Sequence, residues 1–251
     1  MNATGSLATV DDLRRHIAAL ETPGRARGAV TFGVGELDRR LADGGIATGS
    51  LHEITAAGTA LTEDAAATLF TTGIAARAVP SLPILWALTR FDLYAPGLEQ
   101  AGLIPDRVVF AQAREDRDVL AVMEDALRDG SFGAVVGEVC RADMTATRRL
   151  QLAAADGGRT ALLMRRWRRR DANPLDAPSA AATRWRIGCA SSTPLSMPGV
   201  GRAHWRVDLV RQRNGAPFTL TLEGCDAQGR LGLPAASADR AVGAGRRAHA
   251  A

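Results

Sequence analysis

A cluster of five arginines around one tryptophan has the residue types for the most distinctive chemistry in this chain. Its members are Arg165, Arg166, Trp167, Arg168, Arg169 and Arg170. Guanidinium groups bind phosphates, and an indole stacks on a nucleic-acid base. The same cations would also fit an acidic protein surface. A third reading is a solvated loop with Trp167 folded onto the edge of a sheet, and the sequence leaves all three open.

Lysine is absent: all 31 basic residues are arginine. Schiff-base and pyridoxal-phosphate enzymes need an amine, which the permanently protonated guanidinium of arginine cannot supply. An ordinary P-loop NTPase needs a lysine on the phosphates. The composition therefore argues against all three classes.

Charge is divided unevenly along the 251 residues. There are 12 arginines and 19 acidic residues up to Cys140, against 19 arginines and 8 acidic residues from Arg141 onward. Because the second half is strongly basic, we expect it to meet a polyanion or an acidic partner.

The remaining reactive side chains do not form a pattern. Cys140, Cys189 and Cys225 are widely separated, without the spacing of a zinc site or a disulfide framework. His52 lies in an apolar run, where a hydrogen-bonded core histidine is the more common outcome. There is no signal-peptide pattern and no run of about 18 apolar residues. We expect a cytoplasmic protein with no membrane span, catalytic residue, metal or cofactor.

Short apolar runs alternate with helical stretches through the first two thirds of the chain. Strands that are apolar on both faces and separated by helices indicate a parallel sheet covered on both sides. The expected strands are Ser50–Thr55, Ile84–Leu88, Arg107–Ala111, Ala134–Val139 and Thr160–Met164. The expected helices are Asp64–Ala78, Asp116–Arg128 and Thr145–Ala155.

The pattern changes after Met164. Asp171–Thr183 is rich in Pro, Ala and Ser and is expected to be a loop or a disordered segment. Beyond it, apolar residues alternate with polar ones around Trp185, Trp205 and Leu220, which predicts half-buried antiparallel strands. Asn214-Gly215 predicts a hairpin turn between the last two strands.

Two segments resemble RecA-type proteins. Thr31–Ile54, with the sequence TFGVGELDRRLADGGIATGSLHEI, is similar to the stretch that leads into their phosphate-binding strand and loop. Asp92–Gly102, DLYAPGLEQAG, is similar to the stretch after their second core strand. This resemblance implies an α/β fold: a RecA-like core with a mainly parallel sheet flanked by helices, extended by C-terminal antiparallel strands.

The phosphate-binding loop that this resemblance implies is degenerate. Where GxxxxGK[ST] would stand, the chain has AAGTALTED, so that Thr62 falls near the lysine position and Glu63 near the metal-binding hydroxyl. The degenerate loop is represented by Ala56, Gly58, Thr62 and Glu63. Glu138, at the end of the strand that resembles Walker B, is read either as a metal ligand or as a solvated strand end. We expect no ATPase activity.

The amino-acid sequence of the strands and loops is most similar to that of the ImuA family, RecA-like accessory proteins of inducible mutagenesis. The resemblance rests on the loop after LHEI, on TRFDLYAPGL, and on TATRRLQLAAA followed by TALLMR. It implies a non-catalytic adaptor in SOS-induced translesion synthesis. The implied partners are an ImuB-type polymerase-like protein and an error-prone replicative-type polymerase, with RecA and DNA as further candidates.

The expected organisation is an N-terminal amphipathic helix and linker over 1–28, a RecA-like domain over 29–233 and a disordered tail over 234–251. Residues 165–183 form the Arg-rich loop of that domain. Two other functions stay open: a cell-division inhibitor similar to SulA, and a residual nucleotide-dependent ATPase of RecA type.

Overall fold

A computed structural model of the chain describes residues 28–167, 172–192 and 198–234. The expected opening helix and C-terminal tail lie outside the described residues, and so do Arg168, Arg169 and Arg170. None of the described helices is both long enough and apolar enough to cross a bilayer.

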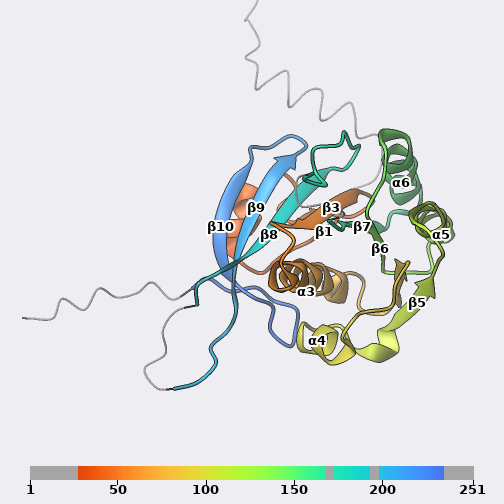
Figure 1. Cartoon of the computed structure of the whole chain (residues 1–251). Helices are drawn as coiled ribbons and strands as arrows, with labels where there is room; N and C mark the ends of the chain where they lie inside the picture. The colour runs from red at the N-terminus through yellow and green to blue at the C-terminus, as the bar shows by residue number, and fades with distance from the viewer. Residues whose placement is uncertain (1–27, 168–171, 193–197, 235–251) are drawn as a thin grey trace, which may run out of the picture.

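Eight strands form one mixed sheet in the order β10-β9-β8-β3-β7-β6-β4-β5 (Figure 1). The strands from β8 to β5 pair in parallel, and β8–β9 and β9–β10 pair antiparallel. The expected fold class is therefore confirmed. The strands are β3 (Leu51–Ala56), β4 (Ile84–Leu88), β5 (Val108–Gln112), β6 (Ala134–Val139), β7 (Thr160–Arg165), β8 (Thr183–Ala190), β9 (His204–Gln212) and β10 (Phe218–Glu223).

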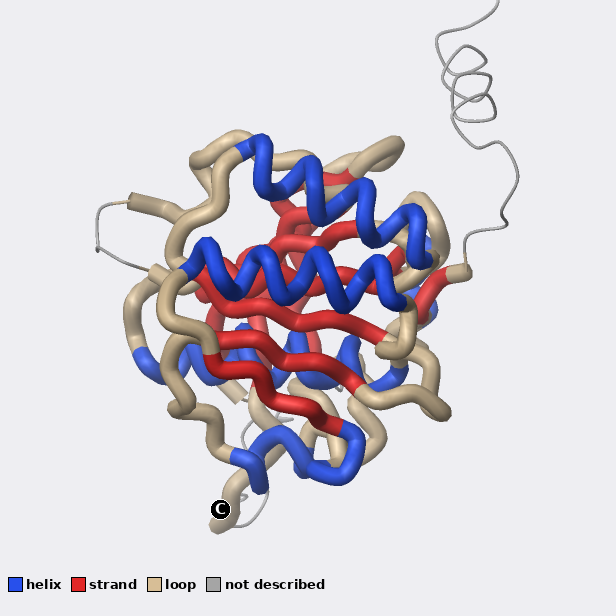
Figure 2. Tube along the Cα trace, turned by 90° about the vertical axis from the view of Figure 1, so that its right-hand side faces the viewer, coloured by secondary structure: helices blue, strands red, loops and turns tan. Residues whose placement is uncertain are grey.

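Helices cover both faces of the parallel part of the sheet. On one face lie α3 (Leu61–Arg77) and α4 (Ala95–Gln100), and on the other lie α5 (Asp116–Asp129) and α6 (Met144–Gly157). In Figure 2, α5 and α6 run across the sheet side by side. The two faces bury separate apolar cores, so the sheet is the middle of three layers.

Local sequence explains where α5 and α6 begin and end. Asp143 caps α6 by accepting a hydrogen bond from the backbone N–H of Ala146. Gly130 ends α5 and Gly158 ends α6, both with the positive φ that favours glycine. The expected ranges were close, although α3 begins three residues earlier than predicted.

A small layer precedes the main sheet. β1 (Ala29–Val30) pairs with β2 (Ile46–Ala47), and between them lies α2 (Gly35–Arg40). The carboxylate of Asp38 accepts hydrogen bonds from the backbone N–H groups of Phe32 and Gly33. The ring of Phe32 is thereby held in the core, within 6 Å of the rings of Phe70 and Trp185. The segment that resembles RecA therefore packs onto the same core as α3.

Three expectations about the strands are resolved by the structure. Trp185 and Trp205 are core residues, and the hairpin turns at Asn214, whose φ is 61°. β5, preceded by the 3₁₀ turn η1 (Pro105–Arg107), is an edge strand and is exposed, so the prediction that it is covered on both faces was wrong. The described part of the loop before β8 is packed, with Leu175, Ser179 and Ala181 buried.

Candidate functional site

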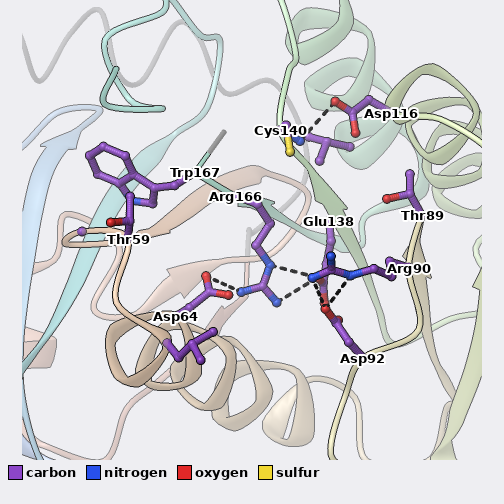
Figure 3. A pocket seen from close by; sticks show the side chains of 13 residues that line it. Thr59, Asp64, Thr89, Arg90, Asp92, Asp116, Glu138, Cys140, Arg166 and Trp167 are labelled. Carbon is purple, nitrogen blue, oxygen red and sulfur yellow. Dashed lines mark hydrogen bonds and ion pairs between the residues drawn. The ribbon is translucent and has the colours of Figure 1, made fainter. Parts of the chain in front are cut away.

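The strongest candidate site is a cavity of about 470 Å³ at the carboxyl ends of the parallel strands (Figure 3). Its wall includes the loop after β3, the first turns of α3, the ends of β4 and β6, and the residues that follow β7. Open α/β sheets bind their ligands at this rim. The degenerate loop and the start of the arginine cluster are thus brought together in one place.

The degenerate loop connects β3 to α3 in four residues. Ala56 is the buried last residue of β3, and Thr62 lies exposed in the first turn of α3. The carboxylate of Glu63 folds back over Gly58: a Cβ built on that glycine would lie 2.6 Å from Oε2 of Glu63. The chain's own carboxylate therefore lies against the loop at the positively polarised end of α3.

Arg166 supplies the cation at the centre of the cavity (Figure 3). Its Nη2 lies 2.8 Å from Oε2 of Glu138 and donates to the hydroxyl of Thr68 at 3.1 Å, and its Nε donates to Glu138 at 2.9 Å. Its Nη1 lies 2.7 Å from Oδ1 of Asp64 but lacks the angle of a hydrogen bond, so this contact is an ion pair. One guanidinium thus joins β6 to the first two turns of α3.

Glu138 is buried and fully engaged. Its Oε1 accepts a hydrogen bond of 2.7 Å from the indole N–H of Trp86, and its Oε2 faces Arg166. The reading of Glu138 as a solvated strand end was therefore wrong. Because both oxygens already have donors, the carboxylate is neutralised from within the chain.

The charge on Arg166 is secured by its surroundings. Burial by itself would lower the pKa of the guanidinium, but the negative charges of Glu138 and Asp64 and the short contacts with both carboxylates together raise the pKa above its ordinary value. Arg166 is therefore a permanent cation.

Trp167 follows Arg166 and lies over the degenerate loop. Its indole N–H donates a hydrogen bond of 2.9 Å to the carbonyl of Ala56, and its ring packs against the apolar core on the α3 face. Of the three readings of the cluster, the one that folds Trp167 onto the sheet edge describes this side chain. Part of the ring surface is therefore covered and cannot stack on a nucleic-acid base.

The prediction that Arg165 contacts a partner or DNA was wrong. It is the last residue of β7, only 3% exposed, and its Nη1 lies 2.9 Å from Oε1 of Glu53. Since a buried, paired guanidinium has no surface to offer, Arg165 is a structural residue and not a contact for a partner or DNA. Arg168, Arg169 and Arg170 lie beyond the described residues and stay a prediction.

The other half of this buried cluster was not predicted from the sequence. Nε of Arg184 lies 2.7 Å from Oε2 of Glu53, so that two arginines from β7 and β8 share one carboxylate from β3. Arg184 precedes Trp185 in a strand that was predicted to be half-buried, yet Arg184 itself is buried. The signal was Glu53 itself, because a carboxylate in an apolar strand requires a countercharge.

Two pairs of contacts shape the mouth of the cavity. Arg90 and Asp92 form an exposed ion pair of 2.6 Å after β4. Asp116 accepts hydrogen bonds from the backbone N–H groups of Cys140 and Arg141, which fastens the turn after β6 to the start of α5. The backbone N–H groups of Cys140 and Arg141 are therefore already bonded and are not available to a ligand at this edge.

The electrostatic balance of the cavity is acidic. Four carboxylates line it, from Asp64, Asp92, Asp116 and Glu138, against the two guanidiniums of Arg90 and Arg166. An anionic triphosphate would meet more negative than positive charge here, and Glu63 adds another carboxylate beside the loop. The excess of carboxylates therefore opposes the binding of a polyanion in this cavity.

Comparison with known proteins agrees with the resemblance seen in the sequence. No protein-family model matches the chain. A curated protein named Protein ImuA, from Caulobacter vibrioides strains NA1000 / CB15N and ATCC 19089 / CIP 103742 / CB 15, is 36% identical over 207 residues, which cover 79% of this chain and 84% of the relative.

Among solved structures, the crystal structure of the RadB recombinase matches with a TM-score of 0.55 and 15% sequence identity. The match covers 82% of this chain and 100% of that chain. This likeness supports the RecA-like fold, and the identity and coverage of the curated relatives decide the family. The chain belongs to the ImuA family.

Proposed function

We propose that this chain is a non-catalytic adaptor of SOS-induced translesion synthesis. In this role it holds together an ImuB-type polymerase-like protein and an error-prone replicative-type polymerase, with RecA and DNA as further candidate partners. The observation that carries the proposal is Arg166, which pairs with Glu138 and Asp64 in the cavity where a RecA-like protein would place its nucleotide.

The non-catalytic part of the proposal follows from charge and shape. Phosphoryl transfer depends on cations that neutralise the phosphates and on backbone N–H groups that surround them. In this cavity the central cation is already paired with two carboxylates, and the carboxylate of Glu63 lies against the loop. A nucleotide would have to break the ion pairs of Arg166 before it could use that charge.

Titration with a fluorescent ATP analogue and Mg²⁺ tests this part. We expect no saturable binding up to millimolar nucleotide and no phosphate release above that of a buffer blank. A matched variant, Glu63→Gly, removes the carboxylate beside the loop while keeping Arg166. Micromolar binding or turnover by the wild-type chain would overturn the non-catalytic proposal and favour a residual ATPase.

The adaptor part needs a docking surface, and we propose that Arg168, Arg169 and Arg170 contribute to it. Arg165 and Arg166 are excluded from this surface because their charges are already paired inside the fold. Arg166 and Trp167, which immediately precede these three arginines in the sequence, are fixed at the rim of the cavity by hydrogen bonds.

Capture of an ImuB-type protein by the purified chain tests the surface. We expect the triple change of Arg168, Arg169 and Arg170 to Ala to weaken capture at least tenfold without changing the melting temperature. A matched control changes Arg117, Arg148 and Arg213, three exposed arginines elsewhere, to Ala and loses the same charge. Equal capture by both triple variants would remove the segment from the mechanism.

A further inference from the structure

We infer that the open face of β8, β9 and β10 binds the phosphate backbone of DNA without reading its sequence. This open face is the side of the three antiparallel strands that is directed away from α3, and its exposed or half-exposed arginines are Arg186, Arg206 and Arg211. None of these arginines lines the cavity around Arg166. Since DNA is one of the candidate partners named above, this inference rests on the proposed function, and it gives that partner a surface of its own.

Strand periodicity directs Arg186 and Arg206 to the same side of the sheet. In β8, Arg186 lies between Trp185 and Ile187, and both of these neighbours belong to the apolar core beneath α3. In β9, Arg206 likewise lies between two residues of that core. Because successive side chains on a strand point to opposite faces, both arginines are directed away from α3.

Arg211 reaches the same face through an irregularity in the pairing. The register of β8 with β9 shifts between Arg184 and Trp185, and beyond the shift Arg211 lies opposite Arg184. Arg184 is neutralised by Glu53, whereas Arg211 donates a hydrogen bond of 2.9 Å to the carbonyl of Ser179. Within the described ranges, Arg211 is therefore an exposed cation without a carboxylate partner.

The helices on this side of the sheet lie elsewhere. The buried apolar core beneath α5 and α6 contains no described residue of β8, β9 or β10. In Figure 1, these three strands lie on the left of the sheet, away from α5 and α6 on the right. The side chain of Arg206 is 59% exposed and that of Arg186 is 37% exposed, and Thr219 and Thr221 of β10 are exposed beside them. A ligand could therefore reach this face directly.

A buried carboxylate orients two of the guanidiniums. Oδ2 of Asp208 accepts a hydrogen bond of 3.2 Å from Nε of Arg186. Oδ1 of Asp208 accepts one of 3.1 Å from Nε of Arg206 and one of 2.7 Å from the hydroxyl of Thr219. Among the described residues, the two Nη groups of Arg206 donate no hydrogen bond. These donors are held in place and are available, which reduces the entropy lost when a ligand binds.

Positive charge exceeds negative charge on this face. The three guanidiniums of Arg186, Arg206 and Arg211 stand against the single carboxylate of Asp208. Glu223, at the end of β10, is already paired with Arg202 at 2.9 Å. A surface of this sign attracts a polyanion.

The chemistry of the face fits DNA better than an acidic protein. Val210 is the one large apolar side chain that is exposed within β8, β9 and β10 as described. Protein interfaces have an apolar core, whereas DNA interfaces are polar and strongly positive. Arginine and threonine side chains are common donors to phosphate oxygens. Because these three strands expose no aromatic ring on which a base could stack, we expect contacts with the phosphates alone.

DNA binding by the full chain, without any partner protein, tests the inference. Fluorescence anisotropy with a duplex of about 20 base pairs is expected to give a Kd of about 1–100 µM near physiological salt, equal for two unrelated sequences. The double variant Arg206→Gln with Arg211→Gln should bind about tenfold more weakly. Its plot of log K against log salt should be shallower by about 2, since each lost phosphate contact changes that slope by about 1. Arg186 is kept because it remains the countercharge of the buried carboxylate.

Two further variants separate this face from general electrostatics. Arg39→Gln with Arg114→Gln removes two exposed arginines elsewhere and should keep the wild-type salt slope. Thr221→Glu keeps every arginine but places a carboxylate opposite Arg206, and it should weaken DNA binding about threefold or more. Thr145→Glu adds the same charge to α6 and should leave binding unchanged. Circular dichroism checks that each variant is folded.

Capture of the ImuB-type protein distinguishes failure here from failure of the adaptor. The double variant of Arg206 and Arg211 should capture that protein as well as the wild type does, and loss of capture would assign the face to the partner protein instead of DNA. The DNA surface would also be overturned by a wild type that binds no DNA, by equal DNA binding of the double variant and its control, or by an acidic peptide that competes as well as DNA of equal charge. In these last three cases, capture by the wild type would still support the adaptor.

Discussion

The guanidinium of Arg166 and the carboxylate of Glu138 lie 2.8 Å apart, 28 residues separated in sequence, at the carboxyl ends of neighbouring strands. Glu138 is nearly inaccessible to solvent, and its other oxygen is bound by Trp86. A buried carboxylate of this kind is tolerated because a cation and a neutral donor share its charge. This relationship makes the cavity a stable part of the fold.

Removing the cation should therefore destabilise the protein. We expect Arg166→Met to lower the free energy of unfolding by about 3–5 kcal/mol at pH 7, because Glu138 is left buried without its countercharge. Urea denaturation measures this loss. The control, Arg166→Lys, keeps the positive charge and should lose less. A loss below about 1 kcal/mol in Arg166→Met would show that solvent neutralises the site.

The shared carboxylate of Glu53 should be at least as important for stability. Glu53→Gln leaves Arg165 and Arg184 buried without a countercharge, and we expect a loss of about 3–5 kcal/mol or failure to fold. Asp92→Asn, which breaks the exposed pair with Arg90, is the comparison and should cost less than about 1 kcal/mol. Thermal melts of the two variants measure the difference, and equal effects would contradict the structural role of Glu53.

Stability should also depend on pH through His52. Burial lowers its pKa from 6.5 to about 4, although the hydrogen bond with the Ala47 carbonyl acts in the opposite direction. Between these values the unfolded chain binds a proton that the folded chain does not. The contribution is thus complete above pH 6.5 and decreases as the pH falls toward 4, by about 1.4 kcal/mol per pH unit.

Urea denaturation between pH 7 and pH 5 tests this contribution of His52. The variant His52→Gln lacks the titrating group, so its unfolding free energy should decrease less than that of the wild type over this range. Parallel curves for the two proteins would mean that His52 titrates normally in the folded state.

Gly137 is required by the packing of α5 against β6. A Cβ at this position would overlap the sulfur of Met123, which is fully buried. We expect Gly137→Ala to cost about 1–3 kcal/mol because of overpacking. In the double variant Gly137→Ala with Met123→Ala the two losses should be less than additive, which a double-mutant cycle measures. Strict additivity would show that the helix moves away without cost.

The sequence predicted the positions of the helices and strands well. It did not predict which charged side chains pair with one another inside the fold. The apolar runs located the parallel strands to within one residue at either end, because a strand buried on both faces has a continuous apolar signature. Strand order is not encoded in periodicity, so the parallel pairing of β8 with β3 could not be derived from it. That pairing brings Arg184 beside Glu53.

The candidate site was predicted in part. The degenerate loop and its acidic residues followed from the motif, but the cluster RRWRRR was treated as one unit, although its first three residues point into the fold. Local composition cannot separate a paired arginine from a solvated one. The partner carboxylates, Glu53, Asp64 and Glu138, come from distant parts of the chain, and only the tertiary structure brings them close.

The salt bridges of Arg166 also bear on timing. In a nucleotide-driven machine, hydrolysis removes a ligand and so sets how long each conformation lasts. In the adaptor proposed here the cation is part of the polypeptide, so its site is complete from the moment of folding. Under that proposal the conformation of the protein would not depend on the supply of nucleotide. The lifetime of its complex with a partner would be set by the dissociation rate, and the amount of complex by how much protein the cell makes.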